Sequence, residues 1–110
     1  MKMRGPTDNE TWIIEARDDV IHKEADHGRS SLSPIECLIH CLWIADYGMR
    51  NAGDLETAAD LYSDFHSEGR ELAEKLSLPF TLETFALSSD EFANQYFERF
   101  DRVCDEIKNA

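Results

Sequence analysis

Helix-start signals constrain the fold of this chain of 110 residues more than any other feature. Three of them are capping boxes, in which a Ser or Thr and a Glu three residues later satisfy free amides at a helix start. The boxes begin at Thr7, Ser33 and Ser88, and Asp54 offers a fourth N-cap. We therefore expect four main helices, over residues of about 8–27, 34–50, 55–78 and 89–108.

Stop signals and apolar spacing agree with these boundaries. Gly28 and Gly53 can adopt the left-handed conformation that ends a helix, and Pro79 prevents the third helix from continuing. Apolar residues recur every three or four positions, and no segment shows the two-residue alternation of a strand. The sequence predicts an all-α fold, a compact bundle of four helices with a short helical turn near 81–87.

The third expected helix contains a continuous apolar seam, formed by Leu55, Ala58, Tyr62, Phe65, Gly69, Leu72 and Leu76. Gly69 lies within this seam, and a glycine there lets a neighbouring helix approach closely. We therefore expect Gly69 to be a packing position and not a break in the helix.

The charge of the chain limits its partners. There are 23 acidic residues and 11 basic ones, which gives a formal net charge of −12. This balance argues against binding of nucleic-acid phosphates and of anionic membrane surfaces. No apolar run approaches the roughly 18–20 residues that cross a bilayer. We expect one acidic helical domain over 1–110, with flexible residues at 1–6 and no nucleic-acid or membrane partner.

The N-terminus and the cysteines predict a cytoplasmic protein. No apolar stretch follows the basic start of the chain, so no signal peptide is expected. Cys37, Cys41 and Cys104 are too few for a disulfide framework, and we expect them to be reduced and mostly buried.

Negative charge concentrates in residues 54–87, which hold eight acidic and two basic residues. Five of the acids follow one another at steps of three or four, namely Glu56, Asp60, Asp64, Glu68 and Glu71. On a continuous helix this spacing places them on one face. Such a face either keeps the protein soluble or recognises a basic partner. The leading hypothesis is a non-enzymatic module that binds a basic protein, of an inhibitor, immunity or regulatory type.

Two groups of residues have the side chains of metal ligands. One is Cys37, His40 and Cys41, with Cys104 as a distant fourth member, but the separated ligand pairs of structural zinc sites are missing. The other is Glu15, Asp19, His22 and Asp26, which offers only part of a carboxylate-bridged di-metal site. We expect neither a metal nor a cofactor, and we expect the second group to face solvent.

A polar and aromatic stripe on the second helix supports an alternative function. It consists of Glu36, His40, Trp43 and Tyr47. The run from His40 to Leu42 loosely resembles the start of the histidine-phosphotransfer motif, but Trp43 and Ile44 stand where that family has Lys and Gly. A phosphotransfer or small-ligand module using His40 is therefore one alternative.

Self-association is the other alternative, because Trp12, Tyr96 and Phe97 together exceed what one small core can bury. A homodimer would cover them. An enzyme is less expected, because the chain has neither a nucleophile elbow nor a phosphate-binding glycine loop.

Overall fold

The computed structural model describes residues 6–110, with side chains described from residue 9 onward. This part of the chain is all-α, as predicted, and contains no strand. Its elements are α1 (Pro6–His27), the 3-10 helix η1 (Arg29–Ser31), α2 (Pro34–Ala52), α3 (Glu56–Leu61), α4 (Phe65–Lys75), α5 (Pro79–Phe85) and α6 (Ser89–Lys108). The predicted flexibility of the chain start falls mainly on residues 1–5, outside the described residues.

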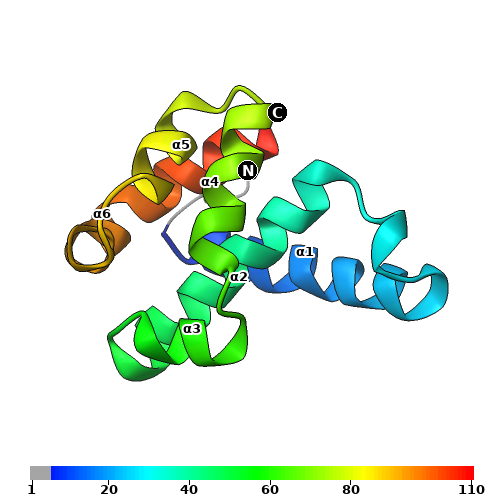
Figure 1. Ribbon diagram of the computed structural model, residues 1–110, viewed down its shortest axis with the longest axis horizontal. Helices are drawn as coiled ribbons and strands as arrows, with labels where there is room; N and C mark the ends of the chain where they lie inside the picture. The colour runs from blue at the N-terminus through cyan, green and yellow to red at the C-terminus, as the bar shows by residue number, and fades with distance from the viewer. Residues whose placement is uncertain (1–5) are drawn as a thin grey trace.

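Helix α2 is the centre of the bundle and packs against α1, α3, α4 and α6 (Figure 1). A helix that is apolar on nearly all sides is expected to be central, and eight residues of α2 are buried. Helices α1 and α2 run antiparallel. Their register is set by three contacts, namely Glu10 with Arg50 at 3.5 Å, Arg17 over the Trp43 ring at 3.7 Å, and Lys23 with Glu36 at 2.9 Å.

The capping box before α2 is confirmed in full. Ser33 Oγ accepts a hydrogen bond from the Glu36 amide at 3.3 Å, and Glu36 Oε1 accepts one from the Ser33 amide at 2.8 Å. Ser88 caps α6 by accepting from the Glu91 amide at 3.3 Å. Asp54 Oδ1 accepts from the Thr57 amide at the start of α3, at 3.1 Å.

The first expected capping box depends on the Thr7 side chain, which is outside the described side chains. Helix α1 begins at Pro6, so Thr7 lies within the helix and not before it.

The segment expected as one helix over 55–78 is divided into α3 and α4. Tyr62 adopts an extended backbone, with φ −155° and ψ 96°, and residues 62–64 link the two helices. Ser63 and Asp64 are poor residues for a helix interior, because their side chains compete for backbone hydrogen bonds. The link lets α4 take its own direction, and Phe65 is buried at its start.

Helix α5 replaces the short turn expected near 81–87 and begins two residues earlier, at Pro79. The chain leaves α4 through Ser77, whose φ of 58° is left-handed. The Ser77 amide then donates to the Glu74 carbonyl, and the Leu78 amide to the Ala73 carbonyl, which is the Schellman pattern. On α6, the carboxylate of Glu106 accepts hydrogen bonds from the free amides at the start of α5.

The core confirms the packing role of Gly69. A β-carbon at this position would overlap the ring of Phe85, so α4 and α5 approach too closely for any larger residue. The expectation that Tyr96 exceeds the capacity of the core is wrong, because its side chain is buried and its hydroxyl is hydrogen-bonded to Asp46. No helix in the described part of the chain combines the length and apolarity needed to cross a bilayer.

Candidate functional site

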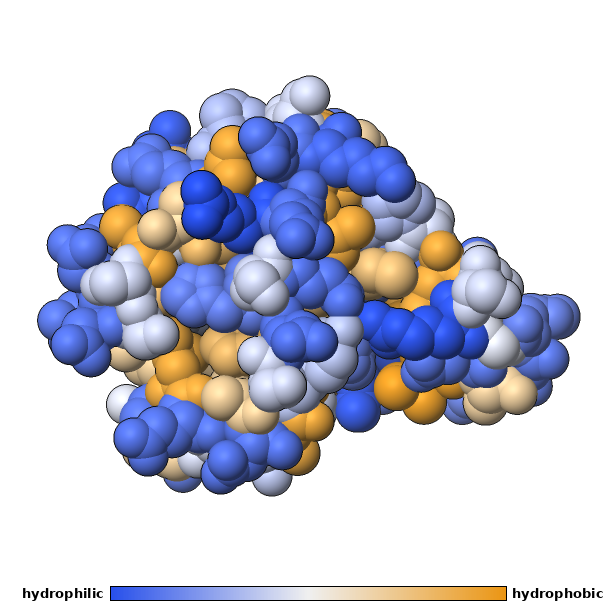
Figure 2. All heavy atoms as spheres, viewed as in Figure 1, coloured by the Kyte–Doolittle hydropathy of each residue, from blue (hydrophilic) through white to orange (hydrophobic). Residues whose placement is uncertain are grey.

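An acidic groove separates α3 and α4 from α5 and α6. It consists of two hollows of about 590 and 390 Å³ that share Ser63 and His66 in their linings. Five carboxylates line it, those of Asp54, Glu56, Glu71, Glu74 and Asp90. Arg70 is the one arginine in this lining. In Figure 2, hydrophilic residues border patches of hydrophobic residues on this side of the molecule.

The five carboxylates come from four places in the chain, and the fold brings them together. Asp54 follows α2, Glu56 begins α3, Glu71 and Glu74 lie on α4, and Asp90 lies in the first turn of α6. Within the described residues, none of the five forms an ion pair. No ion pair within the described residues therefore offsets their negative charge, and this charge would attract a cationic partner.

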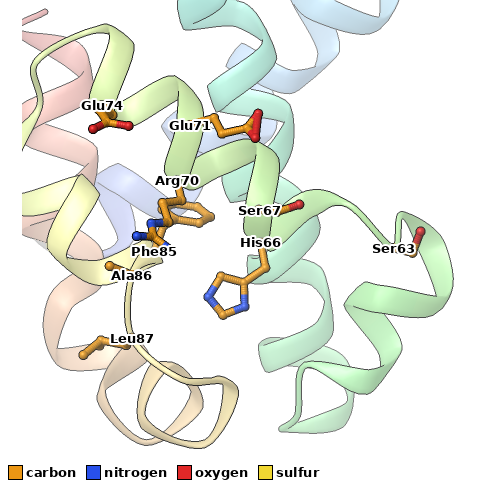
Figure 3. A pocket seen from close by; sticks show the side chains of 9 residues that line it. All are labelled: Ser63, His66, Ser67, Arg70, Glu71, Glu74, Phe85, Ala86 and Leu87. Atoms are coloured by element: carbon orange, nitrogen blue, oxygen red, sulfur yellow. The ribbon is translucent and has the colours of Figure 1, made fainter.

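The groove lacks the geometry of nucleophilic catalysis. His66 packs among aromatic rings, with its ring centre 5.1 Å from that of Phe92 and 5.8 Å from that of Phe65. Ser67 points away from His66 (Figure 3) and donates to the Asp64 carbonyl at 3.3 Å. Among the described residues, no hydrogen bond joins His66 to a hydroxyl or carboxylate, as a nucleophile and base would require.

The five acidic residues predicted as one helical face do not form one, because the chain breaks between α3 and α4. Glu56 and Asp60 lie on α3, Asp64 precedes α4, and Glu68 and Glu71 lie on α4. Only Glu56 and Glu71 line the acidic groove. Sequence reasoning missed the other groove residues, Asp54, Glu74 and Asp90, since their proximity depends on the fold.

Glu68 belongs to an internal polar network. Its carboxylate accepts a short hydrogen bond from the Tyr62 hydroxyl and forms an ion pair with Arg29 at 3.3 Å. The Sγ atom of Cys41 lies 3.3 Å from the same carboxylate. The hydrogen bond to Glu68 raises the pKa of Tyr62 to about 12. Glu68 thus helps to fix α4 against η1 and α2.

The predicted polar and aromatic stripe is divided in the structure. His40, Trp43 and Tyr47 line a hollow of about 510 Å³ between α1, α2 and α3, which we call the aromatic groove. Its lining also includes Arg17, Glu24, Arg29, Ile44, Leu61 and Tyr62. Glu36 is not part of it, since its carboxylate caps α2 and pairs with Lys23. Burial, with the charges of Arg29 and Arg17, lowers the pKa of His40.

The residues with metal-ligand side chains do not assemble. All three cysteines are free, Cys41 and Cys104 are buried, and Cys37 is partly buried. Glu15, Asp19, His22 and Asp26 are exposed on α1. In the part of the chain that the structure describes, no three His, Cys, Asp or Glu side chains are placed to bind one ion.

The aromatic residues considered for self-association have different environments. Trp12 is partly buried, and the Lys108 ammonium lies 5.4 Å from its ring centre. Phe97 is 52% exposed, with the Arg50 guanidinium 5.1 Å from its ring centre.

Comparisons of the chain with protein-family models, with curated proteins and with solved structures found no match.

Proposed function

We propose that this chain is a non-enzymatic interaction module that binds a basic protein partner in the acidic groove, as an inhibitor, immunity or regulatory protein does. The observation that supports this proposal is the set of five groove carboxylates, none of which has an ion-pair partner in the described residues. A basic segment lying in the groove would supply the missing positive charge. The three free cysteines suit the reducing cytoplasm, where we expect the module to act.

The acidic groove suits a partner segment better than a flat face would. Its apolar lining, which includes Phe85 and Leu87, can contact the stems of Lys or Arg side chains while the carboxylates bind their charged ends. The charge field of the chain also steers a basic partner toward the complex, so the association rate should fall as salt is added. Of the residues predicted first, Asp60 and Asp64 are exposed and would contribute to this steering.

Two variants of equal charge test the proposal. The groove variant carries Glu56→Gln, Glu71→Gln and Asp90→Asn, and the control carries Glu15→Gln, Asp18→Asn and Asp19→Asn on the exposed side of α1. Immobilised wild type, groove variant and control are used to capture proteins from a lysate of the source cells at low and at moderate salt. We expect a basic protein to bind wild type and control at low salt, and to be lost from the groove variant.

The control variant separates the effect of the groove residues from the effect of net charge, since both variants remove three negative charges. If the two variants lose capture of the basic protein equally, its binding depends only on net charge. Unchanged capture by the groove variant would place the interface elsewhere.

Self-association is the second candidate, and the exposure of two large apolar side chains favours it. Ile14 on α1 is 53% exposed and Phe97 on α6 is 52% exposed. A homodimer that covers them would be seen by light scattering as a doubled mass, and Phe97→Ser should restore the monomer. A monomer at tens of micromolar would contradict this candidate.

A further inference from the structure

Arg17 is a cation without an anionic partner. Its guanidinium carbon lies 3.7 Å from the centre of the Trp43 ring. Its Nε atom is buried and has no hydrogen-bond partner, and no carboxylate of the described residues pairs with it. A buried donor left unpaired lowers the stability of the fold. The other two guanidinium nitrogens are not fully buried and also have no hydrogen-bond partner among the described residues, and Arg17 lines the aromatic groove, so this arrangement points to a ligand that these nitrogens can bind.

The aromatic groove next to Arg17 has the size and lining of a small-molecule site. Its volume of about 510 Å³ lies within the range usual for such sites, roughly 300–1,000 Å³. The rings of Trp43 and Tyr47 are 5.3 Å apart, and Leu61 is 52% exposed on the α3 side. These surfaces favour a flat apolar body.

The other charges of the aromatic groove are compensated. Arg29 pairs with Glu24 at 3.6 Å and with Glu68 at 3.3 Å. His40 lies against the Tyr62 ring, with 5.6 Å between ring centres, and its lowered pKa keeps it neutral. Arg17 therefore supplies the positive charge that a ligand can neutralise, and one negative charge on the ligand is sufficient.

From this charge complementarity we propose that the aromatic groove binds a small organic anion with a flat apolar body, whose anionic group contacts Arg17 and whose body lies against Trp43, Tyr47 and Leu61. A guanidinium suits this role because it donates two parallel hydrogen bonds to a carboxylate or similar anion. This site takes a ligand of opposite charge to the partner of the acidic groove, and it does not depend on that partner.

Two probes of matched shape and opposite charge test the site, naphthaleneacetate and naphthylmethylamine. Each is titrated into the full chain while the NMR signals of the Trp43 indole N–H and the Arg17 Nε–H are followed. We expect naphthaleneacetate to shift both signals to saturation, with a Kd in the millimolar range or tighter. We expect naphthylmethylamine to bind at least about ten times more weakly, a factor equivalent to about 1.4 kcal/mol. Equal binding of the two probes, or no saturation with the anion, would overturn the proposal.

The variant Arg17→Met separates ligand binding from a structural role. Methionine keeps an apolar stem on Trp43 but removes the charge and the unpaired donor. We expect its affinity for naphthaleneacetate, followed at the Trp43 signal, to fall at least about tenfold while the melting temperature does not fall. Arg70→Met in the acidic groove is the control and should leave this affinity unchanged. An unchanged affinity in Arg17→Met, with a lowered melting temperature, would show that Arg17 is only structural.

Arg17→Lys keeps the charge, and it tests whether Arg17 binds the anion if Arg17→Met folds poorly. We expect it to retain discrimination between the two probes but to bind the anion more weakly than wild type, because an ammonium lacks the paired donors of a guanidinium. Loss of the discrimination would contradict the proposal. Capture of a basic partner should be the same in all Arg17 variants, so failure of one proposal is distinguishable from failure of the other.

Discussion

The hydroxyl of Tyr96 on α6 donates a hydrogen bond of 2.7 Å to Oδ1 of Asp46 on α2. Both residues are buried, with exposed fractions of 2% and 6%. The same carboxylate oxygen accepts from Nε of Arg50 at 2.8 Å, so the buried charge has a cation beside it. Burial and the nearby Asp46 raise the pKa of Tyr96, which keeps its hydroxyl protonated as the donor. This pair links α6 to the central helix.

Of the substitutions Asp46→Ala and Tyr96→Phe, Asp46→Ala should lower the stability of the protein more. It leaves the Tyr96 hydroxyl buried without an acceptor, and we expect the free energy of unfolding to fall by about 2–3 kcal/mol. Tyr96→Phe should cost only about 1 kcal/mol, because Arg50 still pairs with Asp46. Urea denaturation of the two variants and of the double variant measures these changes. Additive effects in the double variant would show that the two side chains are not coupled.

Gly69→Ala should destabilise the protein although alanine is the better helix former. The added methyl group would overlap the Phe85 ring, and overpacking of this kind costs about 1–3 kcal/mol. Thermal unfolding of Gly69→Ala measures the loss. Ser67→Ala, at an exposed position of the same helix, is the control and should change stability little. A Gly69→Ala protein as stable as wild type would contradict the close contact of α4 and α5.

The three cysteines should differ in reactivity. Cys41 and Cys104 are fully buried, and burial raises the pKa of both thiols. Cys37 is partly exposed, and burial raises its pKa as well. At a pH of about 8 we expect a thiol reagent to label native protein slowly and at Cys37 alone, whereas denatured protein is labelled at all three. Mass spectrometry of labelled peptides shows which thiol has reacted.

Cys37→Ser is the control for this labelling, and it should abolish reaction of the native protein. Rapid labelling of Cys41 or Cys104 in that variant would show that the core around α2 and α6 opens readily.

Local signals in the sequence were sufficient for much of the fold. Ser33 and Ser88 marked the starts of α2 and α6, because an N-cap acts within a few residues of itself. The break at Tyr62 could not be predicted from spacing, since the apolar seam continues through it. The contacts of Tyr62 there are tertiary, with Glu68 on α4 and Arg29 on η1.

The candidate sites were less predictable, because distant segments form them. Asp54 and Asp90 line the same hollow only when the start of α6 lies across it from α3. Similarly, the stripe of His40 and Trp43 was visible in the sequence, but its partner Arg17 was not. The antiparallel register of α1 and α2 places Arg17 on Trp43, and no local pattern sets that register.

His40 should make stability depend on pH near neutrality. Its pKa is lowered from 6.5 by burial and by the charges of Arg29 and Arg17, against the weaker opposing effect of Glu24 and Glu68. The unfolded chain therefore takes up a proton at higher pH than the folded one. By linkage, the contribution of neutral His40 to stability is fully present above a pH of about 6.5. This contribution is lost as the pH falls from there toward the lowered pKa of the folded state.

We expect the free energy of unfolding of wild type to fall between pH values of about 7 and 5, and His40→Gln to lack this part of the decrease. The difference between the two proteins, measured by urea denaturation across this range, isolates His40 because all other groups are common to both. The hydrogen bond from the Ser33 amide, with the Lys23 interaction, lowers the pKa of Glu36 from 4.5, so its contribution is lost only at still lower pH. A constant difference across the range would show that the His40 ring is as readily protonated in the folded protein as in the unfolded chain.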